Sequence, residues 1–202
     1  GPANMGGRVT DIDGVPGDTS TFYVSGADGG IHKTEDGGVT FTPIFENQRA
    51  YSIGALTIAP SDKNVLWVGT GEGDPRNSVG YGWGVYRSID GGDTWKHLGL
   101  KKTERIKRIV VDPKDPDIAC VCALGKEWGP NKERGVFKTT DGGKSWDKIL
   151  YIDENTGCAD ITMENENPRI MYAGMWTFRR RPWRFDDGGK NTAIFKTTDG
   201  GE

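Results

Sequence analysis

Ser88-Ile89-Asp90-Gly91-Gly92-Asp93-Thr94-Trp95 is one of four copies of the same pattern in this 202-residue chain, and this repetition specifies the fold. The other copies are Thr34-Glu35-Asp36-Gly37-Gly38-Val39-Thr40-Phe41, Thr139 to Trp146, and the shorter Thr197-Thr198-Asp199-Gly200-Gly201. We call these the Asp-Gly-Gly turns. In such a turn the aspartate accepts hydrogen bonds from nearby amides, the glycines adopt positive φ, and the final aromatic packs beneath the turn. A structural role is therefore predicted for Asp36, Asp90, Asp141 and Asp199.

A short β-type run precedes each turn, and two further apolar runs, joined by a Pro-, Asp- or Asn-rich turn, precede that run. In the second unit the three runs are Ala55 to Pro60, Leu66 to Gly69 and Val85 to Arg87. Each unit predicts four short strands, A to D, with the Asp-Gly-Gly turn joining C to D. The aspartates lie 54, 51 and 58 residues apart, and no segment has helical periodicity. Tandem units of about 50 residues predict an all-β protein, a β-propeller with about four blades covered.

The repeat places residues 1–202 in a single propeller segment, with blades at approximately residues 8–46, 51–100, 106–151 and 157–202. The fourth unit has no aromatic and no strand D after its turn, so we expect the last blade to be incomplete. A strand without a neighbour leaves an exposed edge. We therefore expect the segment to belong to a longer propeller, with further blades supplied by the same or another chain.

The four turns resemble Asp-boxes, also called bacterial neuraminidase repeats, which occur in sialidases, xyloglucan-active endoglucanases and sortilin-like receptors. From residue 1 onward the chain resembles the N-terminal part of large secreted bacterial proteins described as sortilin-like or glycosyl-hydrolase-like. This resemblance implies a propeller that is secreted, periplasmic or displayed at the cell surface. It does not imply a particular activity, because one fold hosts many functions.

Composition argues against several classes of protein. The formal net charge of −3 disfavours a nucleic-acid partner, which normally requires a strong basic excess. No apolar run approaches the roughly 18 residues that cross a bilayer, so we expect no membrane span. No phosphate-binding loop or nucleophile elbow is present, and we expect no cofactor.

The three cysteines do not predict a disulfide framework. Cys120 and Cys122 alternate onto one face of a strand, and Cys158 begins the inner strand of the next blade. We interpret them as small buried thiols in the core between two blades, because free cysteine is among the most buried residue types. A metal site is not expected, since only two histidines are present and no Cys-x-x-Cys pair occurs.

Length variation is concentrated in the B–C connections, which frame the ligand-binding face in this fold family. The first connection, residues 26–30, is short, whereas residues 71–84, 125–135 and 176–191 are long. Loops on a rigid scaffold commonly carry function. Tryptophan and arginine side chains in such loops can stack on sugars or anchor a protein interface. The predicted ligand-binding residues are Glu72, Asp74, Arg76, Trp83, Glu127, Trp128, Arg179, Arg180, Arg181 and Trp183.

Structural alternatives remain open for these residues. The tryptophans could cap the central channel and pack on neighbouring loops, since large aromatics are usually mostly buried. The run Arg179 to Arg181, together with Arg184, could bind carboxylates or phosphates of a ligand. Alternatively it could form salt bridges within the chain, to Asp186, Asp187, Glu72 or Asp74.

Asp28 supports an enzymatic hypothesis. Ala27-Asp28-Gly29-Gly30 resembles the Asp-x-Gly-Gly segment that carries a catalytic acid in xyloglucan-active endoglucanases, where the second acid comes from another propeller domain. A glycosidase needs two carboxylates about 5 to 10 Å apart, and Asp28 could equally be a turn residue. We therefore favour a module that binds a glycan, peptide or protein partner without catalysis in this chain alone. The alternative is a glycoside hydrolase that uses Asp28 with a carboxylate from elsewhere.

Overall fold

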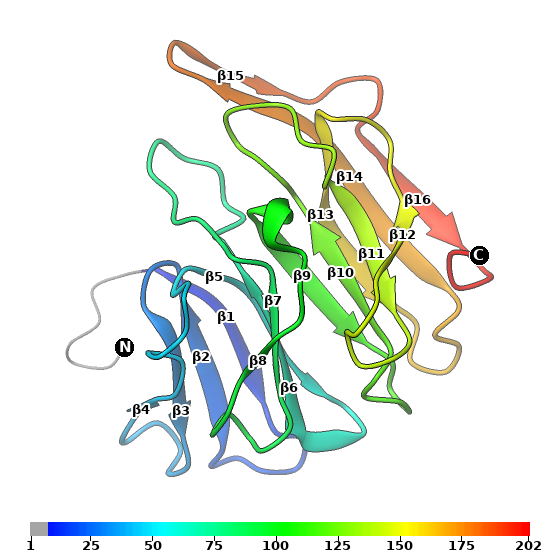
Figure 1. The fold of residues 1–202 in the computed structure, drawn as a ribbon. Coiled ribbons are helices and arrows are strands. Elements are labelled where there is room, and N and C mark those ends of the chain that lie inside the picture. Colours follow the sequence, from blue (N-terminus) through cyan, green and yellow to red (C-terminus); the bar gives the residue numbers. More distant parts are fainter. Residues whose placement is uncertain (1–7) are drawn as a thin grey trace.

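The computed structural model describes residues 8–202; residues 1–7, where the resemblance to secreted proteins begins, lie outside the described part. The chain is all-β, with four small antiparallel four-stranded sheets that form the four blades of a β-propeller (Figure 1). The fold predicted from the repeats is confirmed. Within residues 8–202 the only helix is the 3₁₀ helix η1 (Lys101–Thr103), in the connection between the second and third blades.

Each blade is formed by consecutive strands of the chain. Blade 1 contains β1 (Val9–Gly14), β2 (Phe22–Gly26), β3 (Gly30–Thr34) and β4 (Thr42–Pro43). Blade 2 contains β5 (Ile53–Ala59), β6 (Asp62–Thr70), β7 (Val85–Ser88) and β8 (Lys96–His97). Blade 3 contains β9 (Ile106–Val111), β10 (Ala119–Ala123), β11 (Gly135–Thr139) and β12 (Asp147–Leu150). Blade 4 contains β13 (Thr156–Met163), β14 (Met171–Arg181) and β16 (Ala193–Thr197), with β15 (Arg184–Asp187) paired to the far end of β14.

The Asp-Gly-Gly turns contain the hydrogen bonds expected from their sequence. In blade 2, Asp90 Oδ1 accepts from the Thr94 amide at 2.9 Å and from the Ser88 hydroxyl at 2.7 Å, and Oδ2 accepts from the Thr94 hydroxyl. These bonds favour the charged carboxylate and lower the pKa of Asp90 to about 2. Gly91 and Gly92 have positive φ values of 70° and 99°, which a side chain would strain.

The tryptophans that close the second and third turns connect neighbouring blades. Trp95 Nε1–H donates to the carbonyl of Ile44, in blade 1, at 2.8 Å. Trp146 Nε1–H donates to the carbonyl of Leu98, which follows β8 of blade 2, at 2.7 Å. Each ring therefore has a role beyond the predicted packing beneath its own turn: it also joins its blade to the preceding one.

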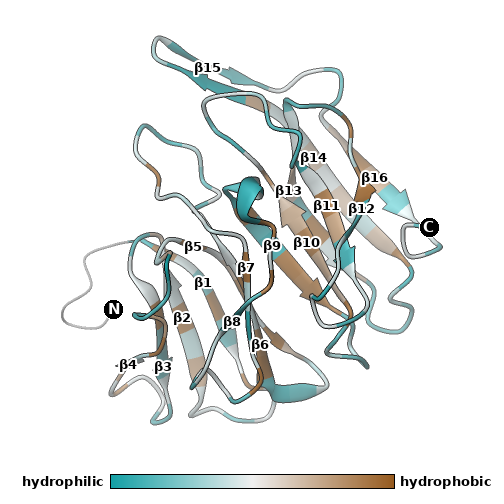
Figure 2. Ribbon diagram, viewed as in Figure 1, coloured by the Kyte–Doolittle hydropathy of each residue, from teal (hydrophilic) through white to brown (hydrophobic). Residues whose placement is uncertain are grey.

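Three apolar clusters lie between successive blades, and Figure 2 shows the corresponding hydrophobic strand segments. The first two are centred on Leu66 and Trp67, which are both 0% exposed. The innermost strands β1, β5, β9 and β13 contact one another in this order. At the first contact Asp13 Oδ2 accepts the Ile58 amide at 2.7 Å, so the side chain supplies a partner for the edge of β5.

A disulfide joins blades 3 and 4. Cys122 on β10 and Cys158 on β13 are bonded, with their Cα atoms 5.0 Å apart. Cys120 is a buried free thiol whose Sγ lies 3.6 Å from Met171 Sδ, and burial raises its pKa to about 12. The interpretation of all three cysteines as thiols is therefore wrong for Cys122 and Cys158, because packing of the blades brings two strands 36 residues apart within bonding distance.

Candidate functional site

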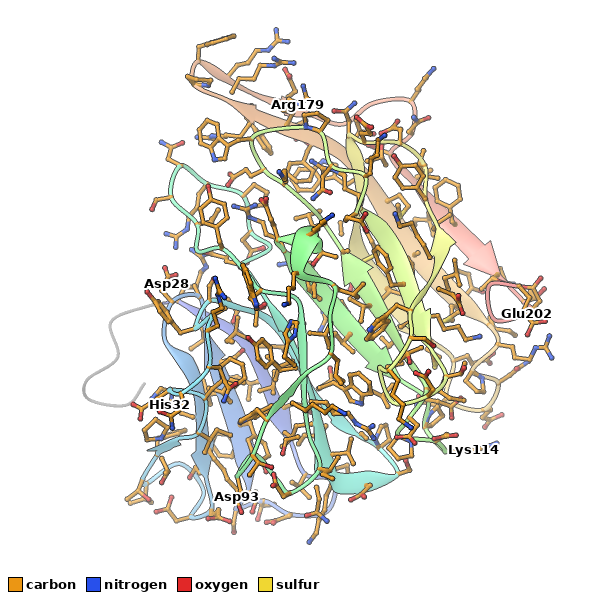
Figure 3. All side chains as sticks on the ribbon, in the orientation of Figure 1. Asp28, His32, Asp93, Lys114, Arg179 and Glu202 are labelled. Atoms are coloured by element: carbon orange, nitrogen blue, oxygen red, sulfur yellow. A yellow bond between two sulfur atoms is a disulfide. The ribbon has the colours of Figure 1, made fainter. Side chains whose placement is uncertain are left out.

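The predicted site residues are carried by connections on one side of the propeller, which we call the loop face. It comprises the β2–β3 turn, the β6–β7 and β10–β11 loops, η1 and the β14–β15 hairpin. In Figure 3 Asp28 and Arg179 lie toward this side, whereas Asp93 and Lys114, in a C–D and an A–B turn, lie toward the opposite one. The structure therefore places the Asp-Gly-Gly turns away from the loop face.

Glu72 is a buried anchor for two arginines. Its side chain is 0% exposed and forms ion pairs with Arg8 and with Arg76, the latter at 3.2 Å. Its backbone amide donates to the Ser52 hydroxyl at 3.1 Å. A buried carboxylate is tolerated only when it is paired, so Glu72 fixes the start of the β6–β7 loop. The Arg76 side chain remains about half exposed and is the member of this group that faces solvent.

A second buried ion pair supports the β10–β11 loop. Arg105 Nη2 lies 3.5 Å from Glu127 Oε2, and both side chains are almost completely buried. Burial raises the pKa of Glu127, an effect that the Arg105 charge opposes. Arg134 donates to the carbonyls of Leu124 at 2.8 Å and of Lys126, and burial lowers its pKa to about 10. These buried groups hold the loop in a defined position. Glu127 was predicted from the sequence, whereas Arg105 and Arg134 were not.

Asp28 is exposed in the turn between β2 and β3. A Cβ atom added to Gly80 would collide with Asp28 Oδ1 and with Ser52, so Asp28 lies against the β6–β7 loop. Because Ser52 also binds the Glu72 amide, Asp28 and Glu72 are close to the same serine. Glu72 is paired with two arginines and fully buried, so it is held as an ion-pair partner. Asp74 is engaged by Lys107.

An open cleft of about 690 Å³ lies between the β6–β7 loop, η1 and the β10–β11 loop. Tyr81 and Trp83 contribute aromatic rings to it, and Tyr81 is 65% exposed. Trp83 is partly buried, with the Arg49 guanidinium 3.8 Å and Lys101 Nζ 5.4 Å from its ring centroid. The exposed ring available to a ligand in this cleft is therefore that of Tyr81, which the sequence analysis did not select.

Positive charge dominates the cleft. Its lining includes four lysines and two glutamates: Lys101, Lys102, Lys126, Lys132, Glu104 and Glu133. Both glutamates are already paired: Glu104 with Lys126 and Arg105, and Glu133 with Lys148. Among residues 8–202 no carboxylate lies within ion-pair distance of Lys101 or Lys102. The cleft therefore offers two uncompensated ammonium groups.

The backbone that presents these lysines is strained. Leu100 and Glu104, which flank η1, have φ values of 54° and 59° and are the non-glycine residues with positive φ in the described chain. Such conformations cost of order 1–3 kcal/mol each and cluster at functional sites. The sequence feature that could have predicted this cationic cleft is the Lys101-Lys102 pair in a D–A connection. The predicted ligand-binding residues did not include this pair because they were all taken from B–C connections.

The β14–β15 hairpin corrects the expectation of a long loop at residues 176–191. β14 extends through Arg181 and pairs with β15, because Trp176, Phe178 and Phe185 pack on one another. Asp186 binds Arg181 at 2.7 Å and Arg184 at 2.6 Å, as the salt-bridge alternative expected. Arg179 donates to Asn155, and Arg180 lies 5.5 Å from the Phe185 ring centroid.

Two tryptophans of the loop face are exposed. Trp183, at the tip of the hairpin, is 76% exposed, and Trp128, in the β10–β11 loop, is 44% exposed. Neither lines the cationic cleft. Residues 8–202 contain no cluster of three or more histidine, cysteine, aspartate or glutamate side chains suited to a metal ion. In the same part of the chain, no helix has the length and apolar character needed to cross a membrane.

Comparison with solved structures shows propellers of similar fold. The xyloglucanase of family GH74 from Xanthomonas campestris superposes with a TM-score of 0.67 at 18% identity, over 97% of this chain and 30% of that enzyme. The GH74 enzyme of Niastella koreensis gives 0.67 at 21%, over 96% and 29%. YCF48 bound to a D1 peptide gives 0.56 at 15%, over 94% of this chain and 53% of YCF48.

These similarities are of fold, since the identities are low and the chain spans about 30% of the length of the GH74 enzymes. The sequence matches no protein-family model and no curated protein.

Proposed function

We propose that this propeller is a binding module whose loop face takes a carboxylate-bearing ligand, a segment of polypeptide or an acidic glycan, in the cleft beside η1. The observation that carries this proposal is the pair of exposed, unpaired ammonium groups of Lys101 and Lys102 next to the exposed Tyr81 ring. Lysines bind carboxylates as point charges, and an aromatic ring provides a flat apolar surface for a sugar or side chain.

Buried ion pairs hold the walls of the cleft in place, and this order favours a role in ligand binding. The buried Arg105–Glu127 pair and Arg134 fix one wall, and Glu72 with its arginines fixes the base of the β6–β7 loop. A wall that is already ordered loses little conformational entropy when a ligand binds. A polypeptide ligand is further supported by the similar fold of YCF48, which is described in complex with a D1 peptide.

The proposal includes an extracytoplasmic location, secreted, periplasmic or on the cell surface. Its support is the buried Cys122–Cys158 disulfide, because structural disulfides persist mainly in oxidising compartments. It also includes membership of the Asp-box class, supported by the repeated hydrogen bonds of the turns. Further blades beside blades 1 and 4 are supported by the exposed apolar side chains Ile12 and Ile194, 59% and 78% exposed.

Charge reversal tests the cleft directly. The probes are a glutamate-rich peptide, polygalacturonate and neutral xyloglucan, and binding is followed by calorimetry at low and high salt. We expect the anionic probes to bind in a salt-sensitive manner and the double variant Lys101→Glu/Lys102→Glu to lose at least tenfold in affinity. The matched control is Lys114→Glu, an exposed lysine on the opposite side (Figure 3), which should leave binding unchanged. Equal affinity in both variants, or no binding of any anionic probe, would refute the proposal.

A glycoside hydrolase is the second candidate, favoured by the exposure of Asp28 on the loop face and by the similar fold of the GH74 enzymes. Catalysis would require a second carboxylate at about 5 to 10 Å, supplied from outside residues 8–202 or by a rearranged loop. Release of reducing ends from xyloglucan should then fall by several orders of magnitude in Asp28→Asn. Equal or absent release in the wild type and the variant would dismiss catalysis by Asp28.

A further inference from the structure

A third cation, Arg49, lies next to the cationic cleft but comes from the preceding blade. Its guanidinium stacks on the Trp83 ring, 3.8 Å from the ring centroid, and Lys101 Nζ lies 5.4 Å from the same centroid. Trp83 and Lys101 line the cleft, whereas Arg49 belongs to the connection between β4 and β5. Positive charge therefore continues from η1, across Trp83, to the connection between blades 1 and 2.

The charge of Arg49 is available to a ligand. Arg49 is exposed, and among residues 8–202 no carboxylate lies within ion-pair distance of its guanidinium. A guanidinium that stacks on a ring through its face keeps the N–H groups at its edge, which match a carboxylate in geometry. Arg49 can therefore bind an anionic group beside the cleft.

The contacts of Trp83 fix the place of this third cation. The Trp83 amide donates to the Thr70 hydroxyl oxygen at 2.6 Å, and His97 Nε2–H donates to the Trp83 carbonyl at 2.7 Å. Ala50, the residue after Arg49, is buried, so the chain is held at this point as well. The ring and the cation on it are thus ordered before a ligand arrives, which lowers the entropic cost of binding.

The spacing of the cations suits an extended polypeptide. The charges of Arg49 and Lys101 are at most about 9 Å apart, because they lie 3.8 and 5.4 Å from one centroid. In an extended chain, side chains at positions i and i+2 are on the same face and about 7 Å apart. Two acidic side chains at such positions can reach both cations together, whereas side chains adjacent in sequence point to opposite faces.

The free polar groups beside the cleft are mainly hydrogen-bond donors. Both carboxylate oxygens of Glu104 take part in ion pairs within the chain. Asn131 Oδ1 accepts the Glu133 amide, and its Nδ2 donates to the Lys102 carbonyl. Sugar hydroxyls need acceptors as well as donors, whereas ionised carboxylates only accept. The surface therefore fits the acidic side chains of a polypeptide better than the hydroxyl groups of a glycan.

We propose that the loop face binds an extended polypeptide segment with two acidic side chains at positions i and i+2. One carboxylate binds the Lys101–Lys102 pair, and the other binds Arg49. This inference rests on the proposed function, because it uses the same cleft, and it adds the class of ligand and a residue that determines specificity. Arg49 favours two acidic side chains over one because it supplies the partner of the second carboxylate.

The test compares labelled, end-blocked alanine peptides that contain Glu-Ala-Glu, Glu-Glu-Ala or a single glutamate. The first two have the same net charge and differ only in spacing. Each is added at low salt to the whole 202-residue chain, and binding is followed by fluorescence anisotropy. We expect the Glu-Ala-Glu peptide to bind about tenfold more tightly than the other two, which is the usual contribution of a hydrogen-bonded charged group.

Variants of the chain locate the second carboxylate. Arg49→Gln should remove the preference for Glu-Ala-Glu over Glu-Glu-Ala, whereas Arg49→Lys, which keeps the charge, should retain most of it. The matched control Lys114→Gln, at an exposed position on the opposite side, should keep the full preference. Because the readout is a ratio between peptides of equal charge, a general loss of electrostatic attraction does not mimic the result.

The outcomes separate this inference from the proposed function. Equal affinities of the Glu-Ala-Glu and Glu-Glu-Ala peptides, or a preference that persists in Arg49→Gln, would overturn the inference. The proposed function would still stand if Lys101→Glu/Lys102→Glu abolished binding of these peptides. Arg49-dependent binding of polygalacturonate without a preference among the peptides would also overturn the inference, in favour of an acidic glycan. Absence of binding by every anionic probe would refute both.

Discussion

Removal of the Cys122–Cys158 bond should destabilise this propeller, because the bond closes a loop between blades 3 and 4. The bond is removed by the double substitution Cys122→Ala/Cys158→Ala, or by reduction of the wild-type protein. The two cysteines are 36 residues apart in sequence. In the chain-entropy description, a loop of that length contributes about 4 kcal/mol to the free energy of unfolding, by restricting the unfolded chain.

Urea denaturation followed by tryptophan fluorescence measures this effect. With an m-value of about 2 kcal/mol per molar urea, a loss of about 4 kcal/mol lowers the midpoint by about 2 M. Cys120→Ala is the matched control, because Cys120 lies on the same face of β10 and is not bonded. This variant should keep its sensitivity to reductant. Peptide mapping without reductant that finds three free thiols or a bond to Cys120 would contradict the bond. A double variant that unfolds at the wild-type midpoint would contradict its contribution to stability.

Three further predictions concern the Asp-Gly-Gly turns. Asp90→Ala should lower the free energy of unfolding by about 1–2 kcal/mol through lost local hydrogen bonds, whereas Asp93→Ala in the same turn should have little effect in urea denaturation. The pKa values of Asp36 and Asp90 are lowered to about 2 from 3.8, so the stability that these carboxylates contribute is complete above about pH 4 and is lost as pH falls toward 2. Urea midpoints measured across pH 2–6 check this pH dependence. A midpoint that does not change across this range would contradict it. Trp146→Phe removes the N–H donor to the Leu98 carbonyl and should cost about 1 kcal/mol, whereas Trp128→Phe, at an exposed position, should leave the melting temperature unchanged.

The repeat made most of the fold predictable from local sequence. Each of the three eight-residue Asp-Gly-Gly turns specifies its own hydrogen bonds, and glycines at positive φ leave few alternatives for the backbone. Four such turns at nearly constant spacing specify the order of strands and therefore the blades. The loops after Gly71 and Gly125 were also predictable, because turn-forming residues interrupt the strand patterns there.

Contacts between blades were not predictable in the same way, because they join residues of different repeats and the pattern within one repeat does not specify them. The Trp95 indole reaches Ile44, and Cys122 reaches Cys158, only after two blades have packed against each other. The burial of Glu72 and Glu127 likewise depends on arginines from other segments, so two carboxylates that looked like ligand-binding groups are ion-pair partners.

The repeating unit, the strand order and the side of the propeller that carries the long connections are thus encoded locally, because they follow from turn chemistry and alternation within about 50 residues. Which side chains are available for binding depends instead on how the blades pack. Packing buries Glu72, covers the ring of Trp83, and brings Lys101 and Tyr81 to one cleft. Exposure and ion pairing depend on neighbours from adjacent blades, and those neighbours are set by the packing of one repeat on the next.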